Sequence, residues 1–256
     1  GEGVFRKIQE AMDNLKEVGV PFGISITATK ENADVILSDE FIDYYFEEKG
    51  AIFGWIFQYM PIGRSYTVDL MVTPEQRKWM LERELDMIYK RRLFLVDFWN
   101  GGIMSVGCIS AAKPGGYFYI DWNGNITPCV FFPYSTLNVN EVYARGSNLS
   151  EAINNEFFQS IRGWQEHYQN DGEYVGNMFR PCPIRDHHTV AQEVIEKYDP
   201  MPIDPDAAKA LTDQEYQRRM VEYGEKIGEL LEPMWLKEVY GRSSAEESAK
   251  AVKERF

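Results

Sequence analysis

The spacing of apolar residues along the first hundred positions alternates between two patterns. Phe5, Ile8, Met12 and Leu15 recur at helical spacing and predict an amphipathic helix over residues 1–19. Short, nearly continuous apolar runs rich in β-forming residues predict strands instead. This half of the chain therefore predicts an α/β fold. Two further helices are predicted over 38–50 and 73–92, and three strands over 20–29, 51–63 and 93–99.

Several of these predicted helices carry recognisable end signals. Ser38 and Thr73 stand where N-caps are expected, and Pro74 follows Thr73 at the first helical position. Gly19 and Gly50 stand where helices end, because glycine adopts the left-handed C-terminal conformation without steric cost.

The three predicted strands are apolar along almost their whole length. Such runs are typical of parallel strands in a sheet that is covered on both faces. Three strands are too few to close an eight-stranded barrel. They predict either an open sheet or part of a larger barrel.

The pattern changes after residue 100. Residues 115–132 predict a β-hairpin that turns at Asn123-Gly124, since Asn-Gly favours tight hairpin turns. A helix capped by Ser150 is expected to follow. We predict three parts: an α/β part over 1–100, a small α+β part with the hairpin over 101–190, and a helical C-terminal extension over 191–256. The later helices are expected over 148–169, 189–198 and 212–231, with a loop over 180–188.

Charge and composition exclude some classes of function. The 40 acidic and 27 basic residues give a formal net charge of -13, which argues against general binding to nucleic-acid backbones. No apolar run reaches the roughly 18 residues of a membrane-spanning helix, and the N-terminus has no apolar signal-peptide centre. We therefore expect a cytoplasmic protein without a membrane partner. Because the chain starts without methionine and inside a predicted helix, we also expect it to be a fragment or a processed form.

The cysteines are few and unevenly placed. Cys108 and Cys129 flank the predicted hairpin, and Cys182 stands beside His187 and His188. A hairpin returns the chain on itself, so its two ends can bring cysteines to a shared metal centre. Free cysteine is also a common small core residue, and the closely spaced cysteine pair typical of zinc sites is absent. The spacing alone leaves core residues, reactive thiols and metal ligands open.

The run from Cys108 to Cys129 has the form C-x15-G-x4-C and contains "YFYIDWNGNITPC". This run resembles the opening of the SPASM/Twitch auxiliary domain of radical S-adenosylmethionine (radical SAM) enzymes. Further along the chain, "EFFQSIR" and "RPCPIRDHH" are similar to later parts of that domain. The preceding α/β part resembles the second half of the partial (β/α)6 barrel of the same superfamily.

The resemblance implies that Cys108, Cys129 and Cys182 bind one auxiliary 4Fe–4S cluster. Such a cluster takes four ligands, and cysteine thiolates are the usual ones. His187 is the expected fourth ligand, with His188, Asp186, water, a substrate or another small molecule as alternatives. Three cysteines suffice for only one cluster, whereas the full SPASM pattern holds two.

The resemblance also implies that S-adenosylmethionine lies at the carboxyl ends of the strands. The residues that match its contacts are Ser25, Thr27, Gln58, Met60 and Asp97. The intact enzyme would form a 5′-deoxyadenosyl radical that takes hydrogen from a small-molecule or peptide substrate. The CxxxCxxC motif that holds the cofactor-cleaving cluster is absent here, so the missing N-terminal half of the barrel is an expected partner.

Two other functions remain compatible with the residues. The chain would be a non-catalytic zinc- or iron-binding module if three cysteines and a histidine held a structural metal. It would be a metal-free α/β binding protein if the cysteines were ordinary core residues.

Overall fold

A computed structural model of the chain describes residues 3–170 and 175–241. The chain is an α/β protein that divides into two compact units. The first unit comprises residues 1–59 and 69–100. The second comprises residues 60–68 and 101–256, and so includes both the hairpin and the C-terminal helices.

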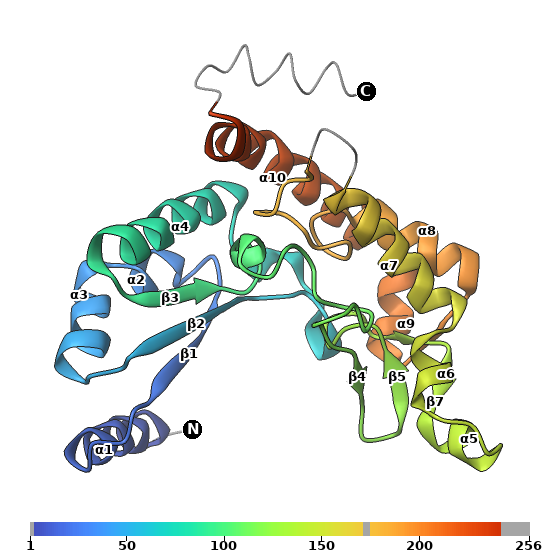
Figure 1. Cartoon of the computed structure of the whole chain (residues 1–256), viewed down its shortest axis with the longest axis horizontal. Helices are drawn as coiled ribbons and strands as arrows, with labels where there is room; N and C mark the ends of the chain where they lie inside the picture. The colour runs from blue at the N-terminus through green and yellow to red at the C-terminus, as the bar shows by residue number, and fades with distance from the viewer. Residues whose placement is uncertain (1–2, 171–174, 242–256) are drawn as a thin grey trace. The chain divides into compact units, whose positions relative to one another are not determined.

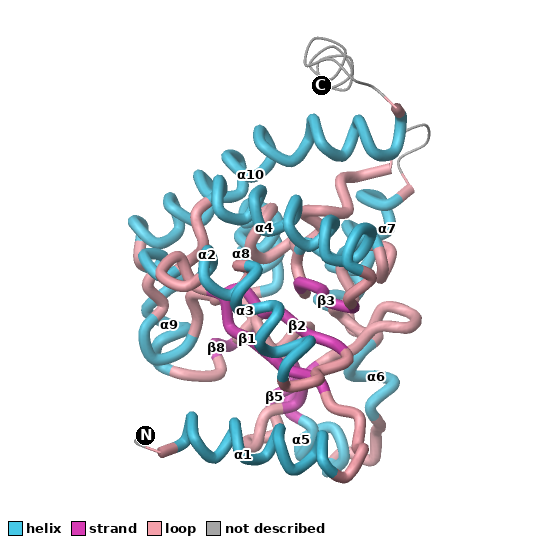
Figure 2. Tube along the Cα trace, turned by 90° about the vertical axis from the view of Figure 1, so that its left-hand side faces the viewer, coloured by secondary structure: helices cyan, strands magenta, loops and turns pink. Residues whose placement is uncertain are grey.

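The first unit contains a three-stranded parallel sheet, as the apolar runs predict. Strands β1 (Gly23–Ala28), β2 (Phe53–Gln58) and β3 (Phe94–Asp97) lie in that order and are shown side by side in Figure 2. Ile56 of β2 pairs with Ile26 on one side and with Asp97 on the other. The carboxyl ends of β2 and β3 therefore lie next to each other.

Helices cover one face of this sheet (Figure 1). Ile24, Ile26 and Ala28 of β1 pack toward them, in a core that also includes Ile56 and Leu95. The alternate residues of β1, Ser25 and Thr27, point to the opposite face and are exposed. Ser25 and Thr27 are thus not covered, although the apolar runs predict a sheet that is covered on both faces. The helical segments are α1 (Val4–Glu17), α2 (Ala33–Ile36), α3 (Asp39–Ile42) with the π-helical η1 (Asp43–Glu48), and α4 (Pro74–Asp86) with the π-helical η4 (Met87–Arg91).

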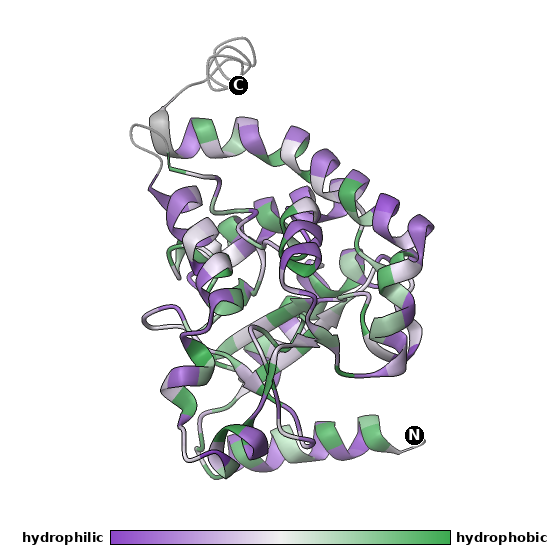
Figure 3. Cartoon of the chain, turned by 90° about the vertical axis from the view of Figure 1, so that its right-hand side faces the viewer, coloured by the Kyte–Doolittle hydropathy of each residue, from purple (hydrophilic) through white to green (hydrophobic). Residues whose placement is uncertain are grey.

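The helix ends in this unit follow the signals in the sequence. Thr73 accepts a hydrogen bond from the backbone N–H of Gln76, whose side chain bonds back to the Thr73 N–H, so the start of α4 is a complete capping box. Ser38 likewise caps α3. Helix α1 forms as predicted, and Figure 3 shows apolar and polar residues alternating along it. Met12 is buried, whereas Phe5 and Ile8 are exposed.

The second unit contains the predicted hairpin. Strands β4 (Tyr119–Ile120) and β5 (Asn125–Thr127) are antiparallel, and β7 (Leu137–Asn138) pairs with β5. Gly124 closes the turn with a φ of 87°, a conformation that favours glycine. A second, two-stranded sheet pairs β6 (Tyr134–Ser135) with β8 (Met201–Pro202).

The helix predicted over 148–169 is broken into two. Asn148 caps α6 (Leu149–Ile153), so the predicted cap at Ser150 is wrong: Ser150 lies inside that helix. Asn155 has an extended backbone and caps the next helix, α7 (Glu156–Gln169), which explains the break. Helix α8 (His188–Tyr198) follows the predicted loop.

The C-terminal part is more helical than the sequence pattern indicates. Helix α9 (Pro205–Thr212) precedes α10 (Gln214–Tyr240), which continues past its predicted end and through Pro233. Residues 242–256 of the predicted extension lie outside the described residues. None of the helices that the structure describes has both the length and the apolar character to cross a bilayer. The remaining short elements are α5 (Val139–Ala144), η2 (Gly63–Ser65), η3 (Val68–Leu70) and η5 (Asn100–Ile103).

Candidate metal centre

Backbone hydrogen bonds join the segments that carry Cys108 and Cys129. The Tyr117 N–H donates to the Ile109 carbonyl at 2.9 Å, and the Ala111 N–H donates to the Pro128 carbonyl at 2.7 Å. The residues next to Cys108 are therefore tied to both strands of the hairpin. This is the return of the chain that the sequence pattern predicts.

The segment that carries Cys182 reaches the same region of the second unit. A small apolar cavity is lined by one close neighbour of each cysteine: Ser110, Pro128 and Pro183. Three segments that are far apart in the sequence thus surround one space. Its remaining walls come from Phe132, Ile161, Ile184, Val190, Ala191 and Val194.

Two of the three thiols are buried, and burial is the main cause of their raised pKa values. Cys129 and Cys182 are only 6% and 8% exposed, and Cys108 is partly exposed. Burial raises the pKa of Cys129, and the negative charges of Cys108 and Cys182 raise it further. Burial, together with the charges of Asp186 and Cys108, raises the pKa of Cys182 to about 12.

Two of the sulfur atoms have polar neighbours. The hydroxyl of Tyr117 lies 2.9 Å from Cys129 Sγ, and the Phe131 N–H donates to the same sulfur at 3.4 Å. The hydroxyl of Ser110 lies 3.2 Å from Cys108 Sγ. Burial raises the pKa of Tyr117, so its hydroxyl keeps its proton at neutral pH. The sequence analysis missed Tyr117 and Ser110, although both lie inside the cysteine–glycine–cysteine run.

Positive charge also lies near the thiols. Arg185 has a fully buried side chain, and its charge lowers the pKa of Cys182 against the larger effect of burial. Its Nε lies 3.2 Å from Asp186 Oδ1. The charges of Cys108 and Lys113 also interact, although burial outweighs this and lowers the pKa of Lys113. Cationic neighbours favour thiolates over thiols, which is the state that binds metals.

The side chains do not yet form a closed ligand set. Among residues 3–170 and 175–241, no three histidine, cysteine or acidic side chains are arranged to hold a metal ion. The donor types fit an iron–sulfur cluster, because cysteine thiolates are its usual ligands.

His187, the predicted fourth ligand, has other contacts. Its Nε2 lies 2.9 Å from the Arg180 carbonyl oxygen, which can only accept, so Nε2 carries the proton. Its ring packs against Trp164 and Tyr168. Asp186 influences the thiol of Cys182 directly and lies 3.4 Å from the Cys182 backbone nitrogen through Oδ2. Asp186 is therefore the acidic group next to this thiol.

The predicted cofactor-binding residues of the first unit fall on two faces of the sheet. Ser25 and Thr27 are exposed on one face. Gln58 and Asp97 are buried, and Gln58 Nε2 donates to Asp97 Oδ2 at 3.0 Å. The structure thus brings Gln58 and Asp97 together and separates them from the two hydroxyls. Met60 belongs to the second unit and is 5% exposed.

A buried polar network surrounds Asp97. Its Oδ1 accepts from the backbone N–H groups of Trp99 at 2.7 Å and Asn100 at 2.9 Å, while Asn100 accepts from Arg77 Nε at 2.9 Å. Burial, followed by the charge of Asp97, raises the pKa of Glu84 well above its ordinary value. Arg77 and Glu84 stand seven residues apart on α4, beside the core positions 80 and 81. That spacing was the available signal for this network.

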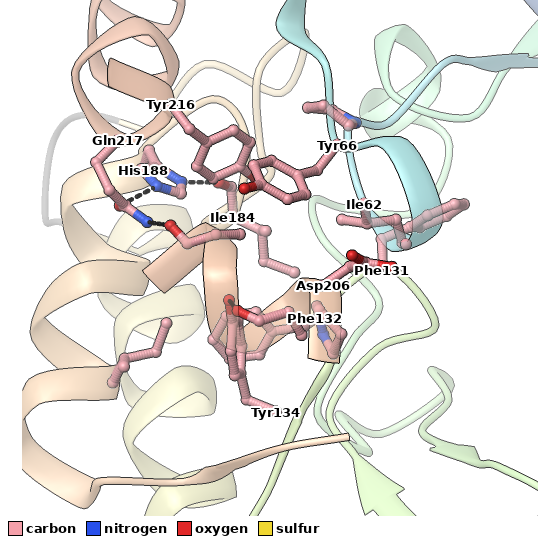
Figure 4. A pocket seen from close by; sticks show the side chains of 16 residues that line it. Ile62, Tyr66, Phe131, Phe132, Tyr134, Ile184, His188, Asp206, Tyr216 and Gln217 are labelled. Atoms are coloured by element: carbon pink, nitrogen blue, oxygen red, sulfur yellow. Dashed lines mark hydrogen bonds between the residues drawn. The ribbon is translucent and has the colours of Figure 1, made fainter. Parts of the chain in front are cut away.

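A second cavity in the second unit has apolar walls and a histidine (Figure 4). His188 lies 2.7 Å from the Ile184 carbonyl oxygen through Nδ1 and 2.8 Å from Gln217 Oε1 through Nε2. Burial lowers the pKa of His188. Both ring nitrogens already have partners, and the rest of the lining is mainly aromatic and aliphatic, with Asp206 and Gln217 as the other polar side chains. The arrangement indicates structural packing.

Comparison with known proteins adds no relative. No protein family, curated protein or solved structure matches the chain.

Proposed function

We propose that the chain is the C-terminal part of a radical SAM enzyme whose auxiliary iron–sulfur cluster is bound by Cys108, Cys129 and Cys182. One observation carries this proposal. Three segments that each carry one cysteine surround one small cavity: Ser110, Pro128 and Pro183, which lie one or two positions from Cys108, Cys129 and Cys182, all line it.

Polar and cationic side chains lie near the thiols. Arg185 and Lys113 provide cations near the thiols, and Tyr117 and Ser110 provide hydroxyls next to two sulfur atoms. When bound, the cluster would supply a redox centre or a site that anchors substrate. The thiolates would bind it, and the apolar residues around Cys129 and Cys182 would exclude water. Asp186, His187 or a bound small molecule would supply the fourth ligand.

The first unit supports the other half of the proposal. Its three parallel strands carry helices on one face and the exposed hydroxyls of Ser25 and Thr27 on the other. Trp55 and Phe57 pair with these residues in the neighbouring strand and are partly exposed. Hydroxyls beside aromatic rings suit the ribose and adenine of S-adenosylmethionine. Asp97, in contrast, has a structural role, because its hydrogen bonds hold the end of β3 in place.

Anaerobic reconstitution of this chain tests the proposal. The purified protein is incubated with iron and sulfide, desalted, and analysed for both elements and for visible absorption. We expect about four irons and four sulfides per chain with a brown colour. The variants Cys108→Ala, Cys129→Ala and Cys182→Ala should each lose most of this content. Val130→Ala, at an exposed position beside Cys129, is the matched control and should retain it.

Other results would contradict the proposal. A colourless protein that retains zinc in a cysteine-dependent way would indicate a structural metal module. A chain that binds neither metal, with thiols that stay unreactive in the native protein, would indicate core cysteines.

The radical-forming part of the proposal has its own test. The gene should encode a CxxxCxxC motif upstream of Gly1, within about 120 residues, as a barrel half of this size requires. An upstream sequence without that motif would contradict the radical SAM assignment while leaving the cluster itself open to measurement.

A further inference from the structure

The segment of residues 106–113 has an unusual concentration of unfavourable backbone conformations. Of the five non-glycine residues with positive φ among those described, three lie here: Val106 at 51°, Ala111 at 59° and Ala112 at 54°. Residues with a Cβ avoid this region for steric reasons, and a β-branched valine avoids it most strongly. Such strain persists only where the surrounding structure enforces it. Contacts from outside the segment must therefore hold these residues in place.

The middle of helix α7 provides two of these contacts. Arg162 Nη1 donates to the Ala111 carbonyl oxygen at 2.7 Å, and Gln165 Nε2 donates to Ser110 Oγ at 3.0 Å. Ser110 and Gln165 are each 2% exposed, so water does not compete for the second bond. Arg162 and Gln165 stand three positions apart and therefore lie on the same side of the helix.

The end of α7 holds both ends of the segment. Gln169 Oε1 accepts from Lys113 Nζ at 3.0 Å, and the same ammonium group donates to the Val106 carbonyl oxygen at 2.7 Å. Lys113 thus connects the first residue of the segment to the helix. Gln169 also packs directly against Gly107, where an added Cβ would lie 2.2 Å from Gln169 Nε2.

We infer that residues 106–113 form a strained strap, which α7 holds closed and which opens as one unit to uncover the small apolar cavity beside it. Ser110 forms part of the wall of that cavity. An open strap loses its hydrogen bonds to α7 but relaxes its three unfavourable φ angles, so the strain lowers the free energy of opening. Because Cys108 lies within the strap, opening also moves its thiol. Neither state requires a bound metal.

A strained strap should respond to glycine in an unusual direction. Val106 is 63% exposed, so Val106→Gly removes little packing. Glycine adopts positive φ without steric cost, which would stabilise the closed strap. In a loop that is merely flexible, glycine would favour the open chain instead, because it increases the number of conformations available there. The two explanations therefore predict effects of opposite sign.

Hydrogen–deuterium exchange of the full chain measures the opening. Three amides of the strap have backbone acceptors when it is closed: Gly107 donates to Gly102 at 2.8 Å, Ala111 to Pro128 at 2.7 Å and Ala112 to Tyr117 at 2.9 Å. Exchange at these amides requires the bonds to break. We expect all three to share one protection factor, because the strap opens as a unit.

Five variants make the test specific. We expect Val106→Gly to raise the protection of the strap about tenfold, and Gln165→Leu and Lys113→Met each to lower it about tenfold. Glu166→Gln, at an exposed position of α7, is the control for the helix and should change nothing. Val18→Gly is the control for glycine, because this valine is 70% exposed and has an ordinary φ of -86°. It should not raise protection in its own segment.

The outcomes decide between a strained strap and an ordinary loop. Higher protection in Val106→Gly together with lower protection in Lys113→Met supports the inference. Unchanged or lower protection in Val106→Gly would overturn it, as would wild-type protection in Lys113→Met or unrelated protection factors for the three amides. If circular dichroism shows that Gln165→Leu does not fold, the other two variants decide the question, because neither position is buried.

Discussion

The side-chain amide of Gln58 donates a hydrogen bond to the carboxylate of Asp97 at 3.0 Å, across the carboxyl ends of strands β2 and β3. Both residues are almost completely buried. Ile56, two residues before Gln58, is the register partner of Asp97, so the two side chains lie on the same face of the sheet. The end of this sheet is therefore fixed by polar contacts as well as by packing.

Replacing Asp97 should destabilise the first unit strongly. Asp97→Ala would leave three buried donors without their acceptor: Gln58 Nε2 and the backbone N–H groups of Trp99 and Asn100. Each unsatisfied buried donor costs roughly 1–3 kcal/mol, so we expect a loss of about 3 kcal/mol or more in the free energy of unfolding. Urea denaturation followed by circular dichroism measures this loss. Asp34→Ala, at an exposed position of α2, should have little effect.

Glu84 should make stability depend on pH. Burial and the charge of Asp97 raise the pKa of Glu84 above its ordinary value of 4.5, so the folded chain favours the protonated form. Its contribution to stability is complete below pH 4.5 and is lost as the pH rises through the raised pKa. Glu84→Gln mimics the protonated form and avoids this loss.

The midpoints of thermal unfolding of wild type and Glu84→Gln should therefore be similar near pH 4 and diverge toward pH 8, with the variant more stable (about 1 kcal/mol or more). Glu82→Gln, an exposed position on the same helix, is the control and should show no such divergence. A constant difference between wild type and Glu84→Gln across this range would contradict the assigned protonation.

Gly124 should tolerate substitution less well than Gly146, although both have a positive φ. A Cβ at Gly124 would lie 2.6 Å from Asn140 Nδ2 and 2.8 Å from Asn138 Oδ1, in addition to the strain of its positive φ. Gly146 also has a positive φ, but a Cβ there would meet nothing within 4 Å. We expect Gly146→Ala to cost about 1 kcal/mol and Gly124→Ala roughly 2–3 kcal/mol. Equal unfolding midpoints for the two variants would show that crowding at the hairpin turn is unimportant.

The sequence by itself determined the features that depend on neighbouring residues. The N-cap at Thr73, the glycine at the hairpin turn and the three apolar strands all appear in the structure as predicted. Each is encoded within a few positions, because caps and turns satisfy local backbone groups and strands need only a run of suitable side chains. The pairing of two cysteine segments through the hairpin followed from the same local pattern.

Only the tertiary structure decided which side chains meet across long distances in the chain. The seven-residue spacing of Arg77 and Glu84 could not by itself predict the buried network around Asp97, since packing brings its partners together. The hydroxyl of Tyr117 beside the sulfur of Cys129 is another such contact. Burial sets the strength of a hydrogen bond and the pKa of a thiol, and burial is a property of the whole fold.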